Sequence, residues 1–112
     1  MSKQRAKGTL AESHLVRWLR ENGIDADRHP LRGNLDQGDI SGVGNWAVEV
    51  KNHRSSSYQA WLREAEAERV NAGAENAVVI HKPHGVGVSD PGKWIAVMTV
   101  DQWFRLIQEV KQ

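Results

Sequence analysis

Cysteine is absent from the 112-residue chain, and its absence excludes a disulfide framework and any zinc site built on cysteine. No apolar run approaches the ~20 residues that a membrane-spanning helix needs, so we expect no membrane segment. The basic N-terminus is not followed by an apolar segment, so we do not expect a secretory signal peptide. These absences favour a cytoplasmic protein.

Excess charge of either sign is also lacking, since the net charge is only +1. The first half of the chain nevertheless carries most of the cations: Lys3, Arg5, Lys7, Arg17, Arg20, Arg28, Arg32, Lys51 and Arg54. This distribution is compatible with binding to a phosphate backbone, although many DNA-binding domains are far more basic. The glycines between Lys82 and Lys93 lack phosphate-loop spacing, so we expect no nucleotide cofactor.

Helical and strand patterns alternate along the chain. The hydrophobic spacing predicts helices over 9–22, 58–72 and from 100 onward, and strands over 24–29, on either side of Gly44, over 76–81 and over 94–98. The order α-β-β-β-α-β-β-α predicts an α/β fold, with a mixed central sheet of about five strands flanked by helices. We expect residues 1–7 to form a flexible basic arm and residues 8–112 to form a single domain.

The helix predicted over 58–72 has an apolar and an acidic side. We expect its inward residues to be Tyr58, Trp61, Leu62, Ala65 and Val70, and its solvated residues to include Glu64, Glu66 and Glu68. The final helix shows an apolar stripe of Val100, Trp103, Ile107 and Val110. Some of the five tryptophans could belong to an interface rather than to the core.

The stretch from Gly38 to Lys51 carries the chemistry. Alternation along a strand places Glu49 and Lys51 on one face, and Asp39 enters from the preceding strand. Two carboxylates and a lysine at one place can hold a hard divalent cation, with the lysine near a phosphate or an attacking water. The alternative is that Glu49 and Lys51 form an ordinary surface ion pair, which would contribute little to stability.

Three further residues have two interpretations each. Glu12 could complete a helix capping box with Thr9, or it could point at the strand ends as a third acid of the site. Asp36 is a rival to Asp39, ranked second because it lies in a loop. His53 is better explained as a polar residue at a strand end than as a metal ligand, because no second histidine stands at metal-binding spacing.

These motifs, in this order, resemble the PD-(D/E)XK nuclease superfamily, and within it the small archaeal-type Holliday-junction resolvases with their phage and bacterial relatives. The matching segments are Gly8-Thr9-Leu10-Ala11-Glu12, Gly38-Asp39-Ile40 and Val48-Glu49-Val50-Lys51. Two positions depart from the pattern. Gly38 stands where the superfamily has its proline, and Arg32-Gly33 stands where the resolvases have Ser-Gly.

The resemblance implies a restriction-endonuclease-like core and a magnesium-dependent endodeoxyribonuclease, with manganese able to substitute. It implies a catalytic set of Glu12, Asp39, Glu49 and Lys51, with the metal held by Asp39, Glu49 and Glu12. The expected substrate is branched DNA, above all a four-way junction cut by a homodimer in a bacterial, archaeal or phage-infected cell. The expected DNA contacts are Lys7, Arg28, Arg32, Asn52, His53 and Arg54.

Two other functions are compatible with the same residues. The first is another nuclease of this chemistry, acting on flaps or nicks or resembling a restriction enzyme. The second is a non-catalytic DNA-binding module that keeps the fold, because a fold does not fix a function.

Overall fold

The computed structural model describes residues 3–29 and 38–111, and its elements follow the predicted order. The three helices are α1 (Lys3–Glu21), α2 (Tyr58–Ala72) and α3 (Val100–Lys111). The five strands are β1 (Asp27–Arg28), β2 (Ile40–Ser41), β3 (Trp46–Lys51), β4 (Asn76–His81) and β5 (Ile95–Val97). A short 3₁₀ helix, η1 (Pro91–Lys93), precedes β5.

The strands form one mixed sheet, as predicted, and their order in the sheet is β1-β2-β3-β4-β5. Antiparallel pairing joins β1 to β2 and β2 to β3, while β3 and β4 run parallel, with Glu49 opposite Val79. A parallel pair needs a crossover connection, which α2 supplies. The strand β5 returns antiparallel to β4.

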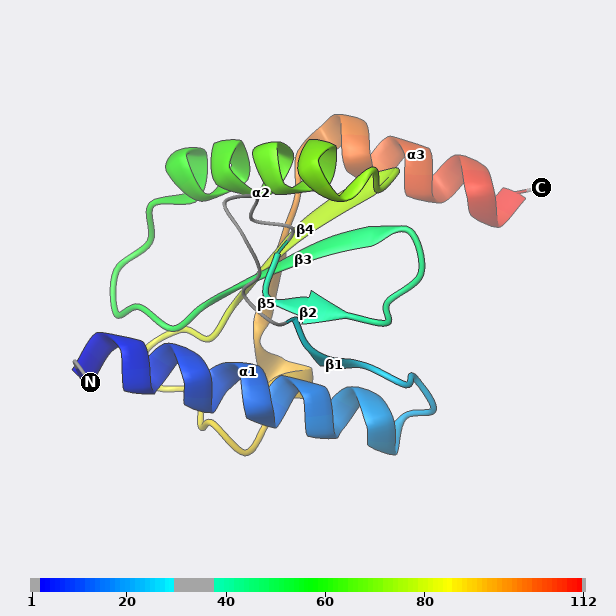
Figure 1. Ribbon diagram of the computed structural model, residues 1–112. Coiled ribbons are helices and arrows are strands. Elements are labelled where there is room, and N and C mark those ends of the chain that lie inside the picture. Colours follow the sequence, from blue (N-terminus) through cyan, green and yellow to red (C-terminus); the bar gives the residue numbers. More distant parts are fainter. Residues whose placement is uncertain (1–2, 30–37, 112) are drawn as a thin grey trace.

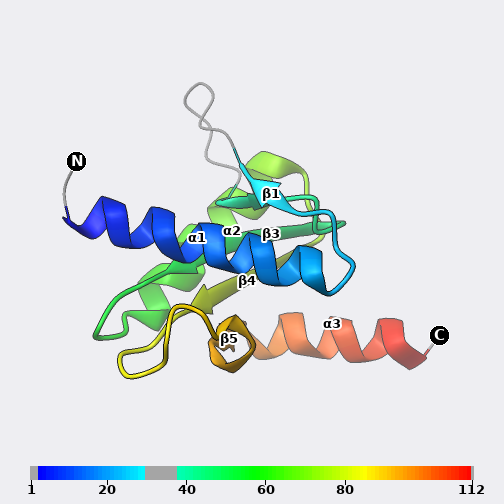
Figure 2. The ribbon, with the colours of Figure 1, turned by 90° about the horizontal axis from the view of Figure 1, so that it is seen from below.

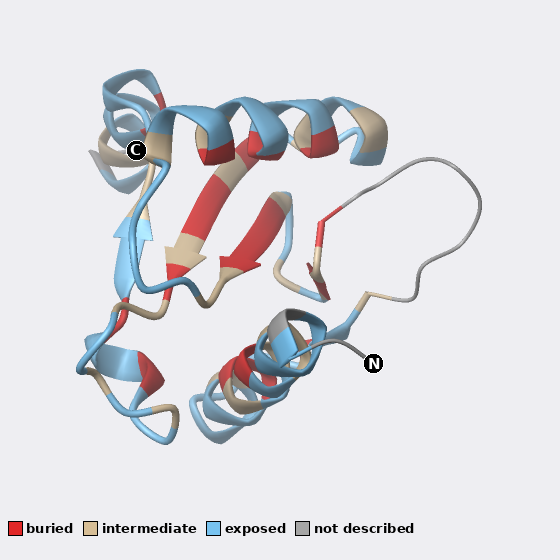
Figure 3. Ribbon diagram, turned by 90° about the vertical axis from the view of Figure 1, so that its left-hand side faces the viewer, coloured by how far each residue is buried: buried red, intermediate tan, exposed pale blue. Residues whose placement is uncertain are grey.

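Helices cover both faces of the sheet, with α1 on one side and α2 on the other (Figure 1). The larger core lies between α1 and the sheet and includes Leu15, Val48 and Val50. The smaller core, on the α2 side, is built on Trp61, Ala65, and Val79. Figure 3 shows that the buried residues of α2 lie on the side of the helix that faces the strands. Because successive residues of a strand point to opposite faces, Glu49 belongs to the α2 side.

The helix α1 begins earlier than predicted. We expected a flexible arm over 1–7, but the segment from Lys3 to Lys7 forms the first turns of α1. Lysine, glutamine, arginine and alanine all favour helix, and Gly8 is tolerated within one at a cost of about 1 kcal/mol. Thr9 therefore lies inside the helix, and the capping box that we predicted for it is wrong.

Other element ends agree closely with the sequence. Both α2 and β4 have the predicted bounds, and α2 ends at Gly73, which has the left-handed conformation with φ 65°. Thr99 caps α3 by accepting a hydrogen bond from the Gln102 N–H at its Oγ1 (3.1 Å). The first strand is shorter than predicted, with only Asp27 and Arg28 paired.

The stripe predicted for α3 exists but is not packed against the sheet. Val100, Trp103 and Val110 are all exposed, and so is Phe104 beside them. Figure 2 shows α3 extending away from the layers formed by α1 and the sheet. None of the helices in the two described ranges combines the length and the apolar character that crossing a membrane requires.

Substituting Val79→Ala should lower the free energy of unfolding by about 2 kcal/mol, because this side chain is 0% exposed and its loss leaves a cavity. Val110→Ala is the matched control. That valine is 81% exposed on α3, so the same change should cost nothing measurable. Urea unfolding of both variants measures the difference, and equal losses would contradict this account of the core.

Candidate metal centre

Asp39 is held against β3 by its own side chain. It directly precedes β2, and its backbone N–H donates to the Val48 carbonyl (2.8 Å). Its carboxylate Oδ2 accepts a hydrogen bond from the Val50 N–H (2.8 Å). The side chain thereby takes a place in the β2–β3 ladder that a backbone carbonyl would otherwise fill. The Asp39 carboxylate therefore lies beside Glu49, which is the residue between Val48 and Val50.

Glu49 is buried among other acids, with only 4% of its surface exposed. Burial raises the pKa of its carboxyl well above the ordinary value, and contacts with Asp39 and then Glu68 raise it further. Each of these carboxyls disfavours a negative charge on its neighbour. A group of buried acids in this condition is stabilised by a cation.

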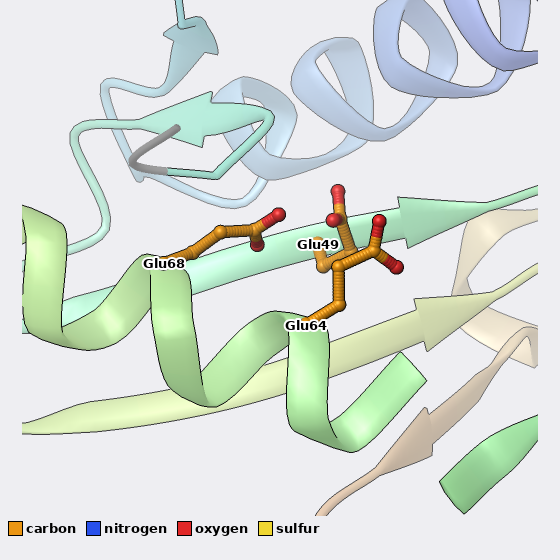
Figure 4. Close-up of side chains that lie close together, drawn as sticks. All are labelled: Glu49, Glu64 and Glu68. Atoms are coloured by element: carbon orange, nitrogen blue, oxygen red, sulfur yellow. The ribbon is translucent and has the colours of Figure 1, made fainter. Parts of the chain in front are cut away.

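Helix α2 supplies two of these acids, Glu64 and Glu68. Oxygen atoms of Glu49, Glu64 and Glu68 all lie within 4.8 Å of one another, and Figure 4 shows the three carboxyl groups converging between α2 and β3. This group shares Glu49 with the predicted metal set, but it contains Glu64 and Glu68 in place of Asp39 and Glu12.

The prediction that Glu68 is solvated is wrong, since it is 2% exposed. The spacing of Glu68 from Trp61 in the sequence already indicated that Glu68 is buried. Seven residues make about two helical turns, so Glu68 lies on the same side of α2 as Trp61 and Ala65. Val70 lies off that side and is 62% exposed, contrary to our expectation. Glu64 and Glu66 are exposed, as predicted.

Glu12 reaches the site from α1. Its carboxylate accepts a hydrogen bond from Arg28 Nε (3.2 Å), and this pair joins α1 to β1. Partial burial raises the pKa of Glu12, the negative charge of Asp39 adds to the rise, and Arg28 opposes it. Of the two interpretations, the structure therefore places Glu12 toward the strands rather than at the end of a helix.

Lys51, at the end of β3, is paired with α2. Its Nζ lies 2.8 Å from Glu64 Oε2, and its side chain is only 17% exposed. Burial lowers the pKa of Lys51. The hydrogen bond to Glu64 and the negative charges of Glu49, Glu64 and Asp39 outweigh that effect, so the net shift is upward. The ammonium therefore remains charged beside the acids.

Gly38 has a backbone conformation that excludes proline at this position. Its φ is +101°, and a Cβ there would lie 3.1 Å from the Val48 carbonyl oxygen. Proline is fixed near −65° and cannot adopt this conformation, whereas glycine adopts it at no steric cost. The backbone before Asp39 thus packs directly on β3 and sets the position of the acid.

The predicted DNA contacts divide into separate groups. Asn52 Nδ2 donates to the Lys7 carbonyl (3.2 Å), and the charges of Lys51 and Lys7 contribute to lowering the pKa of His53, after burial. Lys7, Asn52 and His53 thus lie together beside the end of β3. Arg28 is instead paired with Glu12, and Arg54 is exposed. Arg32 and the rival acid Asp36 lie outside the described residues.

A divalent cation suits this set of side chains. The available ligands are carboxylate oxygens, which hard cations such as magnesium prefer. Asp39, Glu49 and Glu68 are crowded together, so a nearby positive charge stabilises their ionised forms. Lys51 supplies only part of that charge, because it is already paired with Glu64. The residues present therefore fit a divalent metal.

No protein-family model matches the chain, and no curated protein matches its sequence. Its structure is similar to that of Hjc, a Holliday junction resolvase from the archaeal hyperthermophile Archaeoglobus fulgidus. The match has a TM-score of 0.56 and 22% sequence identity, and it covers 80% of this chain and 75% of the other. The two chains share one fold. The resemblance predicted from Glu12, Asp39, Glu49 and Lys51 is thus confirmed at the level of the fold.

Substituting Glu49→Gln should stabilise the metal-free protein at about pH 7–8 by about 1–3 kcal/mol, because it removes an acid that is buried beside other acids. The pKa of Glu49 is raised in the folded state, so the folded state binds more protons than the unfolded state. This contribution to stability is complete below the ordinary pKa of 4.5 and is lost as the pH rises above it.

Thermal unfolding across this pH range, without metal, measures the effect. The variant should show a flatter dependence on pH than the wild type. Glu66→Gln is the control, because Glu66 is an exposed acid whose pKa is lowered by Arg69, and its loss should not stabilise the protein. If the Glu49→Gln variant has the pH dependence of the wild type, the neighbouring acids do not affect the stability of the folded protein through Glu49.

Proposed function

We propose that this protein is a metal-dependent DNA endonuclease, and that it acts as a structure-selective resolvase of four-way junctions. The observation that carries the proposal is the juxtaposition of Asp39 and Glu49 with Lys51 at the end of β3. The same arrangement of elements is found in a solved Holliday junction resolvase, which supports the choice of reaction. We take residues 8–112 to be one nuclease domain.

The metal site of this proposal uses Asp39 and Glu49 as ligands, with Glu12 contributing from α1. A divalent cation bound there neutralises phosphodiester charge and lowers the pKa of its bound water. Magnesium is the expected ion, and manganese should substitute for it. The protein's part is to fix the carboxylates. The Val50 N–H orients Asp39, and Arg28 orients Glu12.

Lys51 stands on the same face of β3 as Glu49, two residues further along the strand. Its ammonium can orient a water for attack or stabilise the negative charge that develops on the phosphate. Because it is only 17% exposed, its charge acts in a medium less polar than water and is correspondingly stronger.

DNA would lie along the cations near the end of β3. Lys7, at the N-terminal end of α1, is next to Asn52 and His53, and Arg54 follows in the same segment. These residues suit contacts to phosphates, which position the duplex without reading its sequence. The proposed setting is the cytoplasm of a bacterial, archaeal or phage-infected cell, where the DNA lies.

A homodimer is part of this proposal. A four-way junction has two-fold symmetry and is resolved by two symmetric cuts, which two identical sites related by a two-fold axis can make. Among the described residues, one protomer has one group of acids placed closely enough to hold a metal ion, and Glu49 belongs to it.

Asp39→Asn should reduce the rate of junction cleavage by at least about a hundredfold, because the amide is a poorer ligand for a divalent cation and carries no charge. The measurement compares a synthetic four-way junction with matched duplex, flap and nicked DNA, with and without magnesium. We expect paired symmetric nicks on the junction alone. Asp90→Asn, an exposed acid paired with Lys93, is the matched control and should cut like the wild type.

Other outcomes decide between the alternatives. Equal cutting of all substrates would retain the metal centre but indicate a general, flap or nicking nuclease. Binding without cutting under any divalent ion would indicate a non-catalytic DNA-binding module. Single unpaired nicks would argue against the symmetric dimer.

Lys7→Gln should weaken DNA binding about equally for all sequences and should reduce the slope of log affinity against log salt by about 1, because one phosphate contact is lost. Fluorescence anisotropy over a salt series measures this slope. Lys93→Gln is the control, because that cation is paired with Asp90 in η1. If both variants keep the wild-type slope, the DNA does not lie along the start of α1.

A further inference from the structure

The ion pair between Lys51 and Glu64 is a feature that the proposed reaction does not use. Glu64 comes from α2, outside the segments that carry the predicted motifs, and its Oε2 lies 2.8 Å from Lys51 Nζ. Its side chain is 47% exposed, in contrast with the buried Glu49 and Glu68. The pair therefore sits at the rim of the group of acids, with the lysine on the inner side.

Lys51 has other acids within range of its charge. Glu49 and Asp39 both act on it electrostatically, and both are ligands of the proposed metal site. A lysine has a flexible four-carbon stem with a compact charge at its end. Without Glu64, the anions that still act on the ammonium would be Glu49 and Asp39, which are ligands of the proposed metal site. An ammonium placed on them would compete with the metal for the same oxygens.

We propose that Glu64 is a positioning residue that holds Lys51 beside the metal site and keeps its ammonium from occupying that site. This inference rests on the proposed function. It assigns to α2 a part in the reaction that the motifs on α1, β2 and β3 do not contain. Glu64 serves this purpose because it is an anion close to Glu49 that is already paired with Lys51.

A competing role for Glu64 is that of a direct metal ligand, since its oxygen lies within 4.8 Å of those of Glu49 and Glu68. The two roles predict different behaviour when Lys51 is removed. A positioning residue has no effect on metal affinity once the lysine is gone, whereas a ligand keeps its effect. A double-mutant cycle separates them.

The experiment is a Mn²⁺ titration by isothermal calorimetry of the wild type, Glu64→Gln, Lys51→Met and the double variant. We expect Glu64→Gln to raise the Kd for Mn²⁺ about two- to fivefold, in keeping with the value of a partly exposed ion pair. In the Lys51→Met background, the same substitution should leave the Kd unchanged. An equal rise in both backgrounds would show that Glu64 is a ligand, and no rise in either would show that it has no role. Both results would overturn the proposal.

Glu66→Gln is the matched control on the same helix, because Glu66 pairs with Arg69 and is not part of the group of acids. It should bind Mn²⁺ and unfold like the wild type. Single-turnover cleavage at saturating metal adds a second readout. There Glu64→Gln should lower the maximal rate constant of cleavage roughly tenfold, while the DNA concentration that gives half of this rate stays constant. A displaced catalytic group slows the chemical step and leaves DNA binding unchanged.

The cycle also separates failure of this inference from failure of the proposed function. If the wild type binds Mn²⁺ but cuts no DNA, the nuclease proposal fails, and the calorimetric cycle still decides the role of Glu64. If the wild type binds Mn²⁺ and cuts DNA while Glu64→Gln behaves like the wild type, only the inference fails. If the wild type binds no Mn²⁺, both are overturned.

Discussion

The crowding of carboxyl groups around Glu49 is the constraint on which the rest of the site depends. Glu49 is buried in contact with both Asp39 and Glu68, and neither neighbour supplies positive charge. The surrounding structure fixes these neighbours firmly. A backbone N–H of β3 holds Asp39, and the packing of Trp61 and Ala65 against Val79 fixes the side of α2 that carries Glu68. The packing that forms the smaller core therefore also holds Glu68 close to Glu49.

Most of the fold could be predicted from the sequence because its signals are local. Alternation identifies β3, a short apolar run identifies β4, and Gly73 ends α2 with the conformation that glycine favours. The start of α1 could not be predicted in this way. The segment from Lys3 to Lys7 has no apolar periodicity, so only helix propensity indicates that it is helical, and a basic segment at a chain end fits a flexible arm equally well.

The proximity of Asp39, Glu49 and Lys51 could be predicted because these residues stand on neighbouring strands. Asp39, Glu49 and Lys51 follow from the pairing of β2 with β3, which a hairpin pattern indicates. The acids of α2 depend on how a helix lies across a sheet, and this is a tertiary feature. Glu68 carries a charge, and charge ordinarily predicts a solvated position. Its spacing from Trp61 indicated burial, and here spacing outweighed residue type.

The pair of Arg28 and Glu12 gives α1 a connection to the strands besides its apolar core. The apolar core packs α1 against the sheet, and the ion pair adds a polar contact between one turn of α1 and β1. Glu12 thus remains directed at Asp39 even though its helix lies on the opposite side of the sheet from α2.

Gly38 has a consequence for how relatives of this chain are recognised. The backbone before the first acid has a positive φ, so the position that gives the superfamily its name would exclude proline here, and other side chains would meet β3. A search pattern that requires proline at this point would pass over any sequence that has adopted this backbone. In this chain the close contact of residue 38 with the strand that carries Glu49 depends on glycine, so glycine marks the position here.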